Sequence, residues 1–183
     1  MNNNEIQIVA FNNPYPPDFG GAIDVYYKIK ALKEIGVKIH LHIYYDDRND
    51  VSGLTHLCES IYLYKKDAKI TKHFSLLPYA VSSRISNELV DNLNKSEAPI
   101  LFESVRTTGV LLHNQFNQKT AVRCHNIESD YSFGLFKSER NWIKKVAFLI
   151  EGCKFQYYES VLEKVDFLFT LSFHEQSYYK KKF

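Results

Sequence analysis

The sequence predicts an α/β fold: a doubly wound, mainly parallel sheet with helices on both faces. Two observations predict it. Short apolar runs typical of buried strands alternate along the chain with segments of helical period. The first helical segment ends at Gly36 and leads into a second strand, which makes a βαβ unit. Strands are expected at residues 6–11, 37–45, 60–64, 100–103, 120–124 and 167–171.

Helical segments lie between most of these strands. They are expected at residues 22–35, 70–76, 85–93, 107–113 and 126–136, with a long helix from about 139 to 164. After the last strand, Ser172 and Glu175 have the spacing of a capping box, which predicts another helix from near Phe173. Little chain remains to complete that helix, so we expect the sequence to be part of a longer protein.

Length and composition indicate one globular domain. The chain has 183 residues and no apolar run near the roughly 20 residues of a membrane span. Its start lacks the features of a signal peptide, and Cys58, Cys124 and Cys153 are far apart, so we expect reduced core thiols in a cytoplasmic protein. A net charge of +2 is too small to indicate a nucleic-acid partner.

The loop from Asn13 to Ala22 is the most informative segment. It joins the first strand to the first helix, and Gly20 and Gly21 stand at the mouth of that helix. Glycines at a helix N-terminus let an anion approach bare backbone N–H groups, so the loop is typical of a site for a nucleotide or sugar phosphate. The alternative is a helix start after a proline-rich turn, with no ligand.

Three segments in order resemble the N-terminal half of a GT-B glycosyltransferase of family 4, the retaining group. The first is this loop with its flanking strands and helix. The second is Ile100-Leu-Phe-Glu103 with the turn after it. The third runs from Arg123-Cys-His-Asn-Ile-Glu128 through the long helix to Ser172. The resemblance implies that residues 1–183 are an N-terminal, acceptor-side Rossmann-like domain and that the C-terminal donor-binding domain is absent from this chain.

The resemblance also implies a function. The intact protein would be a hexosyltransferase-type enzyme that moves a sugar from a nucleotide-sugar to a saccharide or lipid-linked acceptor, in cell-surface polysaccharide or glycolipid synthesis. The donor would be held mostly by the absent domain, without a metal or other cofactor, so this chain alone should be inactive. Two alternatives are a stand-alone sugar- or nucleotide-binding module and an NAD-type dinucleotide-binding domain. Asp46 and Asp47, at the end of the second strand, favour the latter, but the first loop lacks Gly-x-Gly-x-x-Gly.

By the same resemblance, His125 would be the catalytic residue beside the transferring sugar, and Gly20 and Gly21 would face the donor phosphates. Since His125 follows the fifth strand, it should lie at the carboxyl edge of the sheet, although it could instead cap the next helix. A neutral imidazole there could donate to a sugar hydroxyl.

Glu103, Arg123 and Glu128 are the acceptor-side candidates. Arg123 could bind a carboxylate or phosphate, or form an ion pair with Glu128. Glu103 could bind acceptor hydroxyls or cap the following helix.

Other polar residues have simpler interpretations. Asn126 is expected to be a helix N-cap, and Ser172 an N-cap and not a nucleophile. His40 and His42 share one face of a strand, but without a third ligand we expect packing and not a metal site. A basic, aromatic stretch at residues 62–84 either contacts the inner membrane face or is a solvated helix face.

Overall fold

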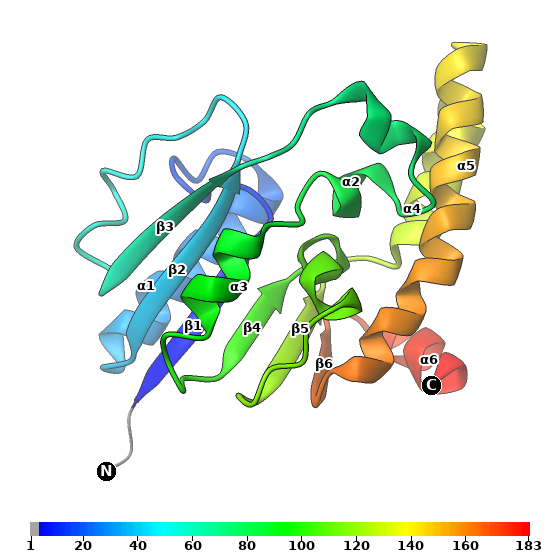
Figure 1. The fold of residues 1–183 in the computed structure, drawn as a ribbon. Coiled ribbons are helices and arrows are strands. Elements are labelled where there is room, and N and C mark those ends of the chain that lie inside the picture. Colours follow the sequence, from blue (N-terminus) through cyan, green and yellow to red (C-terminus); the bar gives the residue numbers. More distant parts are fainter. Residues whose placement is uncertain (1–3) are drawn as a thin grey trace.

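The computed structural model describes residues 4–183, and its six strands form one sheet (Figure 1). The order is β3-β2-β1-β4-β5-β6, and every pair of neighbours is parallel. All six predicted strands are confirmed. They are β1 (Glu5–Ala10), β2 (Lys38–Tyr45), β3 (Ser60–Lys65), β4 (Ile100–Glu103), β5 (Thr120–Cys124) and β6 (Phe167–Thr170). The order reverses direction between β1 and β4, the point at which open α/β sheets bind ligands.

The helices follow the prediction less closely. The described α-helices are α1 (Gly20–Glu34), α2 (Tyr79–Ser82), α3 (Asn87–Leu93), α4 (Glu128–Ser138), α5 (Trp142–Tyr158) and α6 (Phe173–Lys182). Three further segments are 3₁₀ helices: η1 (Ile70–Phe74), η2 (Val105–Leu112) and η3 (Glu159–Lys164). Two short helices predicted as α are thus 3₁₀, and α2 was not predicted. Ser86 caps α3 by accepting from the Leu89 N–H, so that helix begins later than expected.

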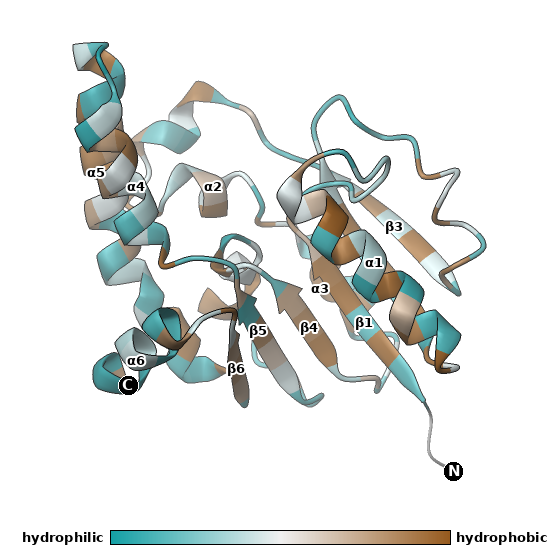
Figure 2. Cartoon of the chain, turned by 180° about the vertical axis from the view of Figure 1, so that it is seen from behind, coloured by the Kyte–Doolittle hydropathy of each residue, from teal (hydrophilic) through white to brown (hydrophobic). Residues whose placement is uncertain are grey.

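Helices cover both faces of the sheet, as predicted. Side chains alternate along β1, so Ile8 and Ala10 pack with α1 while Val9 faces the cluster that includes α3 and η2. Figure 2, seen from behind, shows α1 in front of the sheet beside β1, and α1 contacts β2. The capping box predicted at Ser172 and Glu175 opens α6. The helices cover the two faces of the sheet and not its carboxyl edge. The loops that follow the strands can therefore form a site at that edge.

Helices α4 and α5 form a hairpin beside β6, and α5 projects beyond the sheet (Figure 1). Gly152 permits this close packing, since a Cβ there would lie 2.5 Å from the Phe133 ring. Within residues 4–183, no helix combines the length and apolarity needed to cross a bilayer.

The three cysteines have different environments. Cys124 is buried, Cys58 is partly buried and Cys153 is exposed on α5, and all three are free thiols. The prediction of core thiols is therefore right for Cys124 and wrong for Cys153, which lies on the outward side of its helix.

Candidate functional site

A cavity of about 450 Å³ opens at the carboxyl edge of the sheet. It brings together four of the six predicted site residues, Gly20, Gly21, His125 and Glu128, although they come from two parts of the chain more than 100 residues apart. The residues that line it are Phe11, Asn12, Phe19, Gly20, Gly21, Asp24, Ser104, Arg106, His125, Asn126, Glu128, Tyr131 and Leu171. Glu103 and Arg123, the other two predicted residues, do not line the cavity.

The glycine loop presents an uncapped helix N-terminus to this cavity. The residue before α1 is Phe19, which provides no side-chain cap, and the first turn contains no acidic residue. The first backbone N–H groups of α1, with the positive end of the helix dipole, therefore lack a carboxylate or hydroxyl partner from the capping position. Such an end is suited to a phosphate group.

The two glycines have different roles. A Cβ on Gly20 would meet no atom within 4 Å, so this residue leaves open space at the helix mouth. A Cβ on Gly21 would lie 2.7 Å from the Phe11 ring, and that ring packs edge-on against the His125 imidazole with centroids 5.5 Å apart. Gly20 thus leaves open space beside the helix N-terminus, whereas Gly21 is required for packing beside His125.

The loop itself is held by side chains on other segments. The Asn13 side-chain oxygen accepts from the Tyr15 N–H at 3.0 Å, and its amide donates to the Asp50 carbonyl at 2.7 Å. Arg48 donates to the Tyr15 carbonyl at 2.8 Å and pairs with Asp18 at 2.7 Å. These contacts fix the entry of the chain into α1 without using the helix N–H groups.

His125 is positioned by Glu103. The His125 Nε2 atom lies 2.9 Å from the Glu103 Oε2 atom, and the Glu103 side chain is completely buried. An ionised carboxylate only accepts hydrogen bonds, so Glu103 holds the imidazole proton on Nε2. With that proton on Nε2, the other ring nitrogen, Nδ1, lies 3.9 Å from Asp24 Oδ2. The Nε2–H is therefore committed to Glu103 and is not free to donate to a sugar hydroxyl.

Two cations complete the network. Lys28 donates to Glu103 and lies 3.6 Å from Asp24 Oδ2. Arg123 grips Asp24 with both guanidinium NH₂ groups, one at 3.0 Å, and lies 3.8 Å from Glu103. Burial alone would raise the pKa of Glu103, but His125 and Lys28 outweigh it and lower that pKa. Burial alone would also raise the pKa of Asp24, but Arg123 and Lys28 outweigh burial and lower that pKa. Both carboxyl groups are therefore ionised at neutral pH.

Asp24, Glu103 and His125 could also be read as metal ligands, since one donor atom from each lies within 4.8 Å of the others. The ion pairs argue against that interpretation. Lys28 and Arg123 already neutralise the two carboxylates, and their charges would repel a divalent cation. The donor set suits an ion-paired support for His125 better than a metal centre.

Glu128 is held from the side of η2. Arg106 donates to both carboxylate oxygens of Glu128, at 2.9 and 2.7 Å, and Ser104 Oγ donates at 3.1 Å. Ser104 has φ 79°, in the left-handed half of backbone space, although it is not glycine. Such a residue costs about 1–3 kcal/mol and tends to occur at functional sites. Ser104 joins the end of β4 to η2, and Ser104 and Arg106 both line the cavity.

Several predicted roles need correction. Arg123 pairs with Asp24 on α1 and not with Glu128, which has Arg106 as its partner. Glu103 neither faces the cavity nor caps the next helix with its carboxylate, because that group is held by Lys28 and His125. His125 does not cap a helix. Asn126 is not an N-cap either: Ile127 precedes α4, and no side chain caps it.

Sequence reasoning missed Asp24, Lys28, Ser104 and Arg106. Asp24 and Lys28 had a usable signal, because they follow Gly21 at helical spacing and so share its side of α1. Arg106 had none, since its pairing with Glu128 spans 22 residues and two elements.

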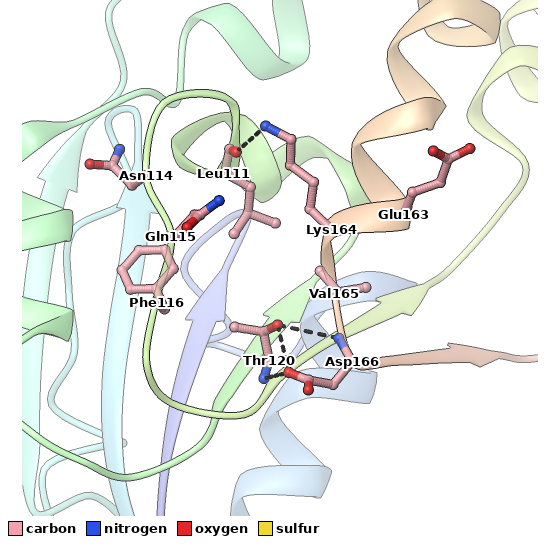
Figure 3. Close-up of a pocket in the computed structure, with 9 residues that line it drawn as sticks. All are labelled: Leu111, Asn114, Gln115, Phe116, Thr120, Glu163, Lys164, Val165 and Asp166. Carbon is pink, nitrogen blue, oxygen red and sulfur yellow. Dashed lines mark hydrogen bonds between the residues drawn. The ribbon is translucent and has the colours of Figure 1, made fainter.

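Other candidate sites are weaker. A second cavity, of about 400 Å³, lies at the opposite edge of the sheet, where Thr120 and Asp166 hydrogen-bond to each other and Lys164 donates to the Leu111 carbonyl (Figure 3). Thr120, Lys164 and Asp166 therefore already have hydrogen-bond partners within its lining. Asp46, the acid expected to bind a ribose in a dinucleotide fold, lies 2.6 Å from Lys66. That pairing weakens the dinucleotide alternative.

Only some residues of the basic stretch at 62–84 lie on the protein surface. Tyr64 and Arg84 are buried, and Arg84 donates to the Phe11 carbonyl at 2.9 Å, behind the candidate site. Lys65, Lys69 and Phe74 are exposed. His40 and His42 pack as expected. A ring nitrogen of His40 hydrogen-bonds with the Ser60 hydroxyl, and a ring nitrogen of His42 with the Tyr64 hydroxyl.

Comparison with known proteins agrees with this architecture. No family model matches the sequence. A protein of Klebsiella pneumoniae described as an uncharacterized 44.6 kDa protein in a cps region is 27% identical over 161 residues, covering 84% of this chain and 41% of that protein. Among solved structures, sucrose-phosphate synthase from Thermosynechococcus elongatus matches 97% of this chain and 44% of its own, with a TM-score of 0.57 and 18% identity.

The structural match establishes the fold. The chain has the Rossmann-like α/β architecture of one half of a GT-B protein, as predicted from the sequence. It spans less than half the length of each of these two similar proteins.

Proposed function

We propose that this chain is the acceptor-side half of a glycosyltransferase that moves a sugar from a nucleotide-sugar to a saccharide or lipid-linked acceptor. The observation that carries the proposal is the cavity in which the uncapped N-terminus of α1, at Gly20, and the supported imidazole of His125 share one wall. One feature suits a diphosphate, and the other suits a sugar hydroxyl.

Two comparisons support this proposal. The fold is shared with part of sucrose-phosphate synthase, and the Klebsiella protein is described as lying in a cps (capsule) region. They favour a role in making a cell-surface polysaccharide or a glycolipid. The resemblance of the ordered motifs to retaining enzymes of family 4 favours retention at the transferred carbon. By the same resemblance we place the activity in the cytoplasm or at the inner membrane face.

The remainder of the enzyme is also a proposal. A second, C-terminal domain would hold most of the nucleotide-sugar and face the cavity of residues 1–183. This chain covers 41% of the Klebsiella protein and 44% of sucrose-phosphate synthase, which leaves room for such a domain. The chain alone should therefore lack transfer activity.

In the proposed reaction, the bond between the sugar and the diphosphate oxygen breaks, the acceptor oxygen forms the new bond to the sugar, and the proton of the acceptor hydroxyl passes to the departing diphosphate. The N–H groups at Gly20 would stabilise charge that develops on the departing diphosphate. His125 Nδ1 would accept a hydrogen bond from a hydroxyl of the transferring sugar and so fix its orientation. Glu103 is a positioning residue, because it touches only the imidazole and the cations behind it. We expect no metal, since the helix dipole here and basic residues on the second domain would hold the diphosphate.

Calorimetry with a panel of UDP- and GDP-sugars separates this proposal from a stand-alone binding module. For the isolated 183-residue chain we expect no binding at submillimolar concentration, and for a protein that includes the second domain we expect binding and sugar transfer. Submillimolar binding by the isolated chain would favour the stand-alone module instead.

A further inference from the structure

Helix α5 carries an uncovered apolar stripe. One side of the helix is buried through Gly152, Phe155 and Tyr158. On the other side, exposed residues recur three or four positions apart, which places them along a single face over four turns. We call this set the α5 stripe: Trp142, Ile143, Val146, Leu149, Ile150, Cys153 and Tyr157. Figure 2 shows hydrophobic residues along α5 where it stands clear of the sheet.

The chain segment around η1 extends this apolar surface. Lys154 donates to the His73 carbonyl at 2.9 Å, and Glu151 accepts from the Tyr79 N–H at 2.8 Å, so the segment is fastened beside the stripe. Its apolar side chains point into solvent: Phe74 is 83% exposed and Leu76 is 95% exposed. Exposed apolar residues gathered on two neighbouring elements indicate an interaction surface and not isolated surface residues.

The tip of the hairpin is basic. Residues 137–145 contain four basic residues and one acid, Glu139. Lys137, Arg140 and Lys144 are exposed. Within residues 4–183, none of the basic residues at the tip forms an ion pair. Glu139 accepts the backbone N–H groups of Arg140 and Asn141, so its charge is directed to the helix start.

We propose that the α5 stripe, the η1 segment and the basic tip dock on the surface of an anionic lipid bilayer. The apolar side chains would enter the headgroup region, and the basic tip would meet lipid phosphates. Tryptophan and tyrosine at the two ends of the stripe, with lysine and arginine beside it, are the residues that favour this interface. The net positive tip favours an anionic bilayer as the occupant, because lysine and arginine near the surface are attracted to anionic lipid headgroups.

This docking would also orient the cavity. Helix α4, the first arm of the hairpin, supplies Glu128 and Tyr131 to the cavity wall. The tip of α5 projects from the edge of the sheet toward which the strands run (Figure 1). A bilayer at the tip would therefore lie on the cavity's side of the molecule, within reach of a lipid-linked acceptor; this last step rests on the proposed function.

Trp142 provides the test, because it is the chain's single tryptophan and is 74% exposed. We would titrate the protein with vesicles of phosphatidylglycerol and phosphatidylcholine, or of phosphatidylcholine alone, and record tryptophan emission and co-sedimentation. We expect a blue shift and binding with the anionic vesicles only. Two variants test the apolar stripe and the basic tip separately. Ile143→Ser should weaken partitioning into the anionic vesicles about fivefold or more. The double variant Arg140→Gln/Lys144→Gln should weaken it about tenfold.

Ile35→Ser is the matched control, since Ile35 is 72% exposed at the far end of α1. It should bind vesicles like the parent. Unchanged emission with anionic vesicles, or equal losses from Ile143→Ser and Ile35→Ser, would overturn the proposal. So would a dimer in sedimentation equilibrium that Ile143→Ser dissociates, since the stripe would then be a contact between copies. The assay contains no nucleotide-sugar, so its failure would leave the glycosyltransferase proposal intact.

Discussion

The Oε2 atom of Glu103 lies 2.9 Å from Nε2 of His125, and the two residues stand at the ends of the neighbouring strands β4 and β5. Glu103 is fully buried, whereas His125 reaches the cavity. A buried, ionised carboxylate therefore supports an imidazole that is open to a ligand. Lys28 and Arg123 make this burial tolerable, because they supply positive charge on the side away from the cavity.

Glu103→Gln tests the charge on this support. The pKa of Glu103 is lowered from its ordinary 4.5, so its ionised form stabilises the fold fully above pH 4.5 and less as the pH falls through the folded pKa. We expect the variant to lose about 2 kcal/mol of unfolding free energy at pH 7. The deficit should shrink below pH 4.5, as followed by urea unfolding across pH. The exposed Glu97→Gln should match the parent, and a deficit that does not change with pH would contradict an ionised Glu103.

Gly20 and Gly21 should respond differently to substitution. Gly20→Ala adds a Cβ in open space, so we expect an unchanged melting temperature and weaker donor binding in the two-domain protein. Gly21→Val must displace Phe11 from its place beside His125, so stability and turnover should fall together. Thermal unfolding and calorimetry with a nucleotide-sugar measure both quantities. Unaltered donor binding by Gly20→Ala would mean that no ligand approaches the helix mouth.

Arg106 and Glu128 should behave as a coupled pair. Arg106→Gln leaves the buried Glu128 carboxylate with Ser104 as its remaining side-chain donor, so we expect a loss of about 2 kcal/mol in unfolding free energy. Glu128→Gln in the same protein should restore part of that loss, because the variant no longer buries an unmatched charge. A double-mutant cycle from urea unfolding gives the coupling. Strictly additive losses would show that the two residues act independently.

The strands and the position of His125 could be predicted because buried parallel strands are continuous apolar runs, and residues that follow them meet at one edge of the sheet. The role of Glu103 could not be predicted, because the alternation of side chains along a strand does not show which residues of other elements contact the last residue of that strand. Asp24 and Arg123 are 99 residues apart, and only the packing of α1 over the sheet brings them together. Helix types failed where segments are short, as at η1 and η2, because periodicity over five to eight residues does not separate 3₁₀ from α.

Glycines in the α4–α5 hairpin offer a test of packing. Gly152→Ala would place a Cβ 2.5 Å from the Phe133 ring and should lower the unfolding free energy by about 1–3 kcal/mol, by forcing the helices apart. Gly134→Ala, on α4, meets no atom within 4 Å and should stabilise the protein by about 0.4–1 kcal/mol, because alanine favours the helix. Denaturant unfolding measures both. Equal effects from the two substitutions would contradict the tight contact at Gly152.

The most direct test of the proposed function is the turnover of His125→Ala in the protein that carries both domains. We expect kcat for sugar transfer to fall by about 10²-fold or more, the size of effect expected when a positioned group at a reacting centre is lost. The melting temperature should stay within a few degrees of the parent, because His125 is partly exposed at the cavity. His113→Ala, at an exposed position after η2, is the matched control and should turn over normally. Unchanged turnover of His125→Ala with an intact fold would contradict the assignment of this cavity as the site of transfer.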